Sequence, residues 1–140
     1  MKNKLIEIIN EHIEEGDFIG EVSDDDIKKA ETTLKVCFPT EYKEFIKKYG
    51  SGGICGVDIL GVEGADYASV VESTEHQRRF GLPNKYIVIE NVDEFVYCLN
   101  TVEEFNVIRW DDINKIEVTR YKTFEEYLED SFQEAIDNLD

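Results

Sequence analysis

The sequence predicts a single α+β domain, residues 1–140, in which helices pack around a central, mostly antiparallel sheet of four or more strands. Apolar residues recur at helical spacing in the first half of the chain and at its end, whereas short extended runs separated by polar turns follow Pro83. These runs leave no room for the crossover helices of a dozen or more residues that parallel strands require. A chain of 140 residues can bury such a core without disulfides or metals.

Three helices are expected before Gly50, because apolar side chains recur there every three or four positions. The first should span residues 2–15. The second should follow Ser23, which can cap its first turn, and the third should span residues 39–49. Their predicted inward stripes are Leu5, Ile6, Ile9 and Ile13 in the first, Ile27, Ala30 and Leu34 in the second, and Tyr42, Phe45, Ile46 and Tyr49 in the third.

A strand is expected at residues 54–60, because this run is rich in β-branched residues and follows a glycine-rich turn at 50–53. A fourth helix should cover residues 67–80, with Asp66 able to cap it and Pro83 ending the segment. The turn at 50–53 leads from a helix into a strand and lacks lysine, so it is not expected to be a phosphate-binding loop.

An antiparallel meander is expected after Pro83, with strands at residues 86–90, 95–99 and 107–110 and a weaker one at 115–121. The last helix begins at a capping box formed by Thr123 and Glu126, and its apolar stripe extends to Leu139. Acidic residues should cover its outer face.

The chain is strongly acidic, with 32 acidic and 15 basic residues, a formal net charge of −17 and a sequence pI of about 4.4. Nucleic acid and anionic membranes are therefore not expected as partners, because binding phosphates requires clustered Lys and Arg. The charge has two interpretations that composition leaves open. It can simply keep the protein soluble, or it can attract a cationic partner.

Several features favour a cytoplasmic protein without cofactor, metal or catalytic site. Polar residues interrupt the first apolar run, which argues against a signal peptide, and no stretch reaches the roughly 20 apolar residues of a membrane span. The three cysteines, Cys37, Cys55 and Cys98, form no ligand or disulfide pattern and are expected to be buried free thiols. His12 and His76 lack the helical pairing of a metalloprotease.

Trp110 and two acidic pairs are the candidate functional residues that need a choice between interpretations. Trp110 ends a predicted strand, so it is either core or an interface anchor flanked by charge. The pairs Glu103-Glu104 and Asp111-Asp112 are either solvated turns or groups that could bind a metal or transfer a proton. An enzyme would require Asp111, Asp112 and one of the histidines to converge in a pocket.

Several short motifs resemble the SUKH superfamily, which includes the yeast cell-wall-assembly and killer-toxin-resistance regulators. The resemblance covers nearly the whole chain. Its marks are Glu31 with Leu34, Phe38-Pro39, Tyr42 with Phe45 and Tyr49, and Gly50-Ser51-Gly52-Gly53. A closer resemblance to the YobK-type immunity proteins of Bacillus lies in Gly56-Val57, Leu60-Gly61, Ala68-Ser69-Val70-Val71, Val88-Ile89-Glu90, residues 95–101 and Trp110-Asp111.

This resemblance implies an α+β fold and a protein that is not an enzyme. It further implies an immunity protein that binds and neutralises the C-terminal domain, often a nuclease, of an LXG-type polymorphic toxin. The alternative is a regulatory or scaffold protein of the same fold with a housekeeping partner. The expected partner is a toxin with a basic surface, and the chain itself is expected to be a monomer or weak homodimer.

The predicted partner-binding residues lie in turns and strand ends of the central region, because those positions present charge without being needed for a helix. They are Asp58, Glu90, Asp93, Glu94, Glu103, Glu104, Trp110, Asp111 and Asp112. Acidic residues on helices are expected to matter less.

Overall fold

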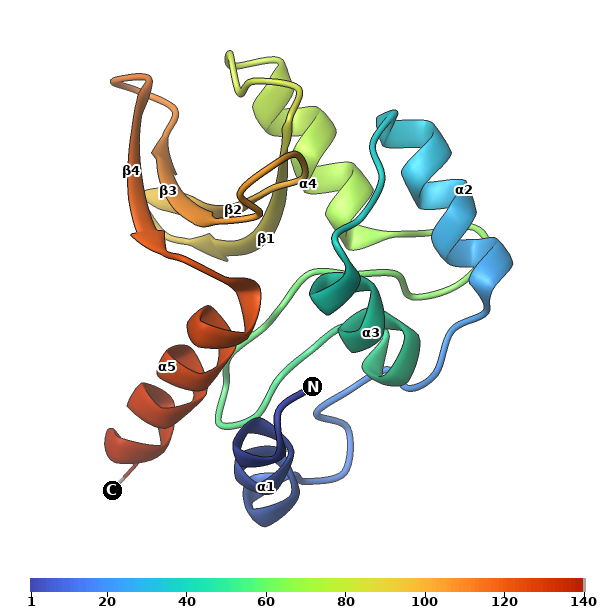
Figure 1. The fold of residues 1–140 in the computed structure, drawn as a ribbon, viewed down its shortest axis with the longest axis vertical. Coiled ribbons are helices and arrows are strands. Elements are labelled where there is room, and N and C mark those ends of the chain that lie inside the picture. Colours follow the sequence, from blue (N-terminus) through green and yellow to red (C-terminus); the bar gives the residue numbers. More distant parts are fainter. Residues whose placement is uncertain (140) are drawn as a thin grey trace.

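Five helices and four strands make up the part of the chain described by the computed structural model, residues 1–139 (Figure 1). In chain order they are α1 (Asn3–His12), α2 (Asp24–Leu34), α3 (Thr40–Tyr49), α4 (Ser69–Arg78), β1 (Tyr86–Val92), β2 (Phe95–Asn100), β3 (Val107–Asp111), β4 (Ile116–Tyr121) and α5 (Phe124–Asp137). The α+β class is confirmed, and so is the meander after Pro83.

The sheet is an antiparallel meander in the order β1-β2-β3-β4. Two irregularities in register, between Val88 and Glu90 and between Val107 and Ile108, bend it. Figure 1 shows the resulting curl, with α4 beside β1, α1 and α5 at the other end of the molecule, and α3 between them and α4. The backbone N–H of Val88 donates to the Thr74 hydroxyl oxygen at 2.8 Å, which ties β1 to α4.

Two predicted helix caps are present. The hydroxyl oxygens of Ser23 and Thr123 each accept a hydrogen bond from the backbone N–H three residues on, both at 3.1 Å. At the C-terminal end of α3, Gly50 has a φ of +74° and donates its N–H to the carbonyl of Ile46, which ends the helix. These contacts place the helix boundaries near those that the sequence predicts.

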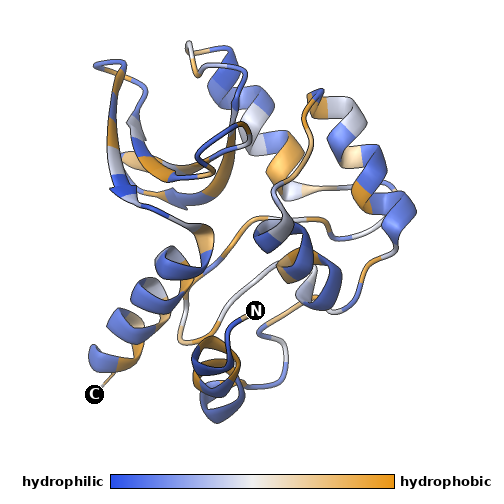
Figure 2. Cartoon of the chain, in the orientation of Figure 1, coloured by the Kyte–Doolittle hydropathy of each residue, from blue (hydrophilic) through white to orange (hydrophobic). Residues whose placement is uncertain are grey.

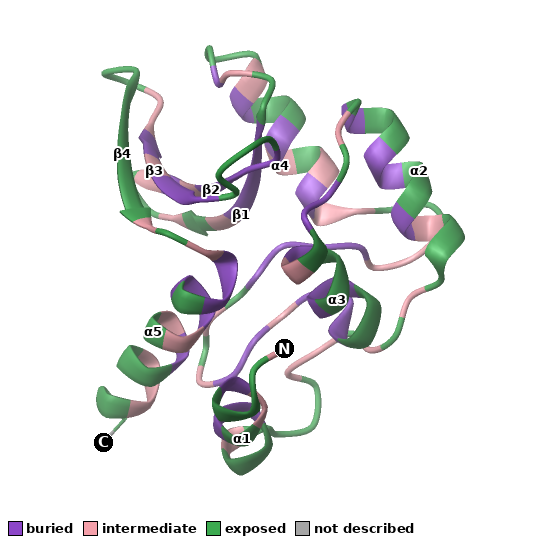
Figure 3. Cartoon of the chain, viewed as in Figure 1, coloured by how far each residue is buried: buried purple, intermediate pink, exposed green. Residues whose placement is uncertain are grey.

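The core brings together the inward stripes of the helices and three of the strands. Figure 3 shows buried residues along β1 and β3, whereas β4 is exposed along most of its length. Hydrophilic residues cover much of α2 and α5 (Figure 2). Aromatic rings join α3 to α5, with Phe124 standing edge-on to Tyr42 and Phe45 at centroid distances of 5.2 and 5.7 Å.

The predicted strand at residues 54–60 is wrong. Only one isolated bridge forms there, between Gly52 and Ile59, and the chain turns at Cys55 and Gly56, both of which have positive φ. Ile54 and Ile59 are nevertheless fully buried. The β-branched residues that suggested a strand therefore serve the core as an irregular loop, because burial selects the same side chains whether or not a ladder forms.

Smaller differences concern the helix ends. α1 stops at His12, so Ile13 is 46% exposed rather than inward. α4 begins at Ser69 without a cap from Asp66. The Glu63 carboxylate instead accepts the backbone N–H of Ser69 at 2.7 Å.

The last helix and the cysteines also depart from expectation. Glu125 of α5 is buried, and its carboxylate accepts the backbone N–H of Lys2. The acidic residues of α5 therefore do not all lie on its outer face. All three cysteines are free, but Cys98 alone is buried and Cys37 is exposed. None of the helices within residues 1–139 has the length and apolar composition that crossing a bilayer requires.

Candidate partner-binding site

The meander brings four of the predicted residues together. Because alternate turns of an antiparallel meander lie at the same end of the sheet, the β1–β2 and β3–β4 turns are neighbours. There they line one hollow of about 340 Å3, which we call the hairpin hollow. Its walls include Gln77 of α4 and four predicted site residues, Asp93, Glu94, Trp110 and Asp112.

Trp110 belongs to the core, which is one of the two interpretations that its sequence position allowed. The residue is 4% exposed, so it cannot project into a partner as an anchor. Its indole N–H has no hydrogen-bond partner among the described residues, although the nitrogen is fully buried. The amide oxygen of Gln77 is buried and unpartnered in the same way.

Asp111 has a local structural task at the β3–β4 turn. Its carboxylate accepts the backbone N–H of Ile113 at 2.9 Å and the side-chain amide of Asn114 at 2.8 Å. The hydrogen bonds from Asn114 are the main reason why its pKa lies below the usual range. Asp111 therefore shapes the turn that carries Asp112, rather than lining the hollow itself.

The other predicted residues lie elsewhere. Glu103 and Glu104 belong to the β2–β3 loop at the opposite end of the sheet, where Glu104 borders a separate hollow together with Phe38 and Phe105. Asp58 and Glu90 form a second acidic spot near α5. Burial raises the pKa of Glu90, as do the nearby charges of Asp58 and Glu134, while a hydrogen bond from the Tyr127 hydroxyl opposes the rise.

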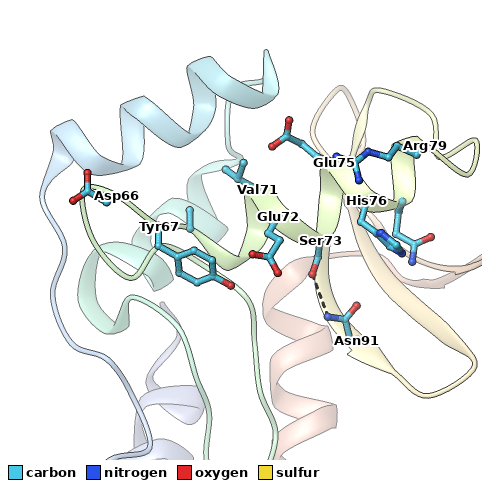
Figure 4. Close-up of a pocket in the computed structure, with 11 residues that line it drawn as sticks. Asp66, Tyr67, Val71, Glu72, Ser73, Glu75, His76, Arg79 and Asn91 are labelled. Atoms are coloured by element: carbon cyan, nitrogen blue, oxygen red, sulfur yellow. Dashed lines mark hydrogen bonds between the residues drawn. The ribbon is translucent and has the colours of Figure 1, made fainter.

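A second hollow of about 540 Å3 adjoins the hairpin hollow, and we call it the helix hollow (Figure 4). The two share Gln77 and Asn91 in their walls. Asn91 donates its side-chain amide to the Ser73 hydroxyl oxygen at 3.2 Å, which joins β1 to α4 where the two hollows meet. The two hollows together are referred to below as the α4 groove.

Acidic side chains dominate the α4 groove. The helix hollow contributes Asp66, Glu72 and Glu75, and the hairpin hollow contributes Asp93, Glu94 and Asp112. The only Lys or Arg side chain among the lining residues is Arg79. Its neighbour Arg78 is turned away and donates to the carbonyls of Leu34 and Asn84 at 3.0 and 2.9 Å. The groove therefore presents negative charge to any partner.

Sequence reasoning missed Glu72, Glu75 and Gln77. Acidic residues on helices were expected to matter less, but α4 packs beside β1, so that Glu72 and Glu75 line the helix hollow and Gln77 lines both hollows. The available signal was the composition of α4, which has few apolar positions and so exposes much of its surface.

The described residues of the α4 groove do not form a metal-binding site. Within residues 1–139, no three His, Cys, Asp or Glu side chains are placed so that they could hold a metal ion. What the groove offers chemically is a set of hydrogen-bond acceptors with negative charge, beside the unpartnered indole and amide atoms of the hairpin hollow.

The architecture is that of a single α+β domain, with five helices packed on a four-stranded antiparallel sheet. The family then follows from comparison with family models. Residues 1–133 match the SUKH_5 family, described as SMI1-KNR4 cell-wall, and the chain belongs to that family. SUKH proteins are commonly immunity proteins against polymorphic toxins and are generally not catalysts.

Proposed function

We propose that this chain is an immunity protein that binds and neutralises the C-terminal domain, a nuclease, of an LXG-type polymorphic toxin. The observation that carries the proposal is the α4 groove, in which acidic residues from a helix and two turns surround two adjoining hollows. Family membership supports it, and the resemblance to YobK-type immunity proteins supplies the class of toxin.

The proposed mechanism is occupation rather than catalysis. A nuclease binds phosphates through clustered Lys and Arg, so its substrate-binding surface is basic. Carboxylates held in the α4 groove would take the place of those phosphates and exclude the nucleic acid. The net charge of −17 would also accelerate encounter with such a surface, because a field of opposite sign steers association.

The proposal places the chain in the cytoplasm of the producing cell, acting as a monomer or weak homodimer. Each chain would then present one α4 groove to one toxin domain. A nucleic-acid or membrane partner is not proposed, since the acidic groove would repel both.

Co-expression tests the function directly. C-terminal domains of LXG-type toxins from the same genome would each be expressed from an inducible promoter with and without the chain, and growth would be measured together with nucleic-acid integrity. We expect growth to be restored, and we expect purified chain to inhibit the purified toxin domain at a one-to-one ratio. Unchanged toxicity in the presence of folded chain would show that the neutralising function is wrong.

A further inference from the structure

Two residues that line the hairpin hollow each carry a buried polar atom without a hydrogen-bond partner within residues 1–139. The donor is the indole N–H of Trp110, and the acceptor is the amide oxygen of Gln77. Both residues are more than nine-tenths buried, with exposed fractions of 4% and 8%. Leaving a buried polar group unpaired costs about 1–3 kcal/mol, so two such groups in the wall of one acidic hollow call for an explanation.

The two groups restrict what can bind. A ligand must donate hydrogen bonds to Gln77 and to the surrounding carboxylates, and it must also accept one from Trp110. A simple cation or a polyamine has no acceptor to offer. A phosphate has acceptors but would be repelled by Asp93, Glu94 and Asp112.

A polypeptide with a basic side chain meets both requirements. Its side chain donates and its main-chain carbonyl accepts. Arginine suits the hollow better than lysine, because the planar guanidinium has five donors in a fixed fork and can reach Gln77 and a carboxylate at once. The two basic residues nearest in sequence to Asp112 are already engaged: Lys115 donates to the carbonyl of Phe80, and the guanidinium of Arg109 lies 5.0 Å from the centroid of the Phe95 ring.

We propose that the hairpin hollow is a receptor for one arginine side chain and an adjacent main-chain carbonyl on a partner loop. That the partner is a toxin rests on the proposed function, whereas the chemistry of the receptor rests on these side chains. Gln77 is the moving part. Its side chain has three rotatable bonds and borders both hollows, whereas both polar atoms are covered in the structure. In the proposed receptor, a change of the Gln77 rotamer exposes them to the ligand.

Trp110 is the only tryptophan in the chain, so its indole N–H gives a single, isolated NMR signal that reports on the receptor. The probe is N-acetyl-arginine-N-methylamide, titrated at constant ionic strength. Spermidine supplies charge without a carbonyl, and N-acetyl-alanine-N-methylamide supplies carbonyls without charge. We expect a saturable downfield shift of the indole proton with the arginine probe alone. An unmoved signal, or an equal shift with either control, would overturn the proposal.

A variant separates recognition from structure. Gln77→Leu removes the unpaired acceptor, so it should leave the free energy of unfolding unchanged or raise it, while weakening the arginine probe about tenfold. Gln133→Leu, at an exposed glutamine of α5, is the matched control and should leave the affinity unchanged. If Gln77→Leu retains the full affinity, or loses affinity only together with stability, the assigned role of Gln77 is wrong.

The two proposals fail in different ways. If the arginine probe binds as described but the chain does not protect against the toxin, the receptor stands and the toxin partner is wrong. If the chain protects but Trp110 does not respond to arginine, the immunity function stands and the receptor is wrong.

Discussion

Glu31 is a buried carboxylate that organises the connection between α2 and α3. It is 5% exposed, accepts the backbone N–H of Phe38 at 2.7 Å and lies 3.6 Å from the ammonium of Lys43. The resemblance to the SUKH superfamily singled out Glu31 and Phe38-Pro39 from sequence alone. The structure gives the physical reason, because the Glu31 carboxylate accepts the buried backbone N–H of Phe38. This motif therefore preserves the connection between two helices rather than a binding site.

Replacing Glu31 should therefore cost stability. In Glu31→Ala the buried N–H of Phe38 loses its acceptor, so we expect the free energy of unfolding to fall by about 2–3 kcal/mol in a urea titration. Lys43→Ala is the control. The Lys43 side chain is 46% exposed, so its loss should cost less than about 1 kcal/mol. Equal losses in the two variants would contradict the assignment of the hydrogen bond as the main contribution.

Replacing Glu90 should raise the free energy of unfolding, in contrast to Glu31, and the gain should depend on pH. Burial raises its pKa in the folded state, so the ionised form is penalised above that pKa and the penalty is absent below the ordinary value of 4.5. Glu90→Gln should raise the free energy of unfolding by roughly 1 kcal/mol near neutral pH. The gain should vanish as the pH falls below about 4.5. A gain that is independent of pH between 4 and 7 would show that the charge is not its cause.

At the scale of elements, the segment between α3 and α4 shows where sequence patterns stop being informative. The helices and the meander were predictable because period and turn residues agree. Residues 54–60 satisfy the composition of a strand, but the turn at Cys55 and Gly56 leaves only single backbone contacts, such as the hydrogen bond from the Leu60 N–H to the carbonyl of Ile89 in β1, and no ladder. Their conformation depends on contacts with α3 and β1, such as the hydrogen bond from the Tyr42 hydroxyl to the carbonyl of Leu60, which a local pattern does not contain.

Close packing in this segment gives a direct test. A methyl group at Gly61 would lie 1.9 Å from the carbonyl oxygen of Gly50, whereas one at Gly64 would meet nothing within 4 Å. We expect Gly61→Ala to lower the free energy of unfolding by about 3 kcal/mol or more and Gly64→Ala to change it by less than about 0.5 kcal/mol. Similar melting temperatures for the two variants would contradict the packing described for this loop.

The candidate site was only partly predictable for the same reason. Asp93, Glu94 and Asp112 were chosen because turns present charge, and the antiparallel order of the strands then brings them together. Glu72, Glu75 and Gln77 could not be assigned to that group from sequence, since which face of α4 meets the hairpin is decided by tertiary packing. Trp110 needed the structure to choose between core and interface.

At the scale of the whole molecule, acidic residues in different places should contribute unequally to toxin binding. α1 also carries exposed acids, Glu7 and Glu11, but Figure 1 places it at the other end of the molecule from α4. If the α4 groove is the docking surface, position rather than net charge should determine protection. Screening acts over about 10 Å at 0.1 M salt, so acids near the contact dominate the rate of encounter.

The central claim, that a basic toxin docks in the α4 groove, is tested most directly by the association rate measured from about 50 to 500 mM salt. Two variants with equal change in net charge are compared with the wild type. The groove variant changes Asp93, Glu94 and Asp112 to Lys, and the control changes Glu7, Glu11 and Glu14 to Lys. We expect the association rate of the wild type to fall about tenfold or more as salt rises. The control variant should keep most of this salt dependence. The groove variant should associate slowly at every salt concentration. A wild-type rate that is independent of salt, or equal slowing in both variants, would contradict the claim.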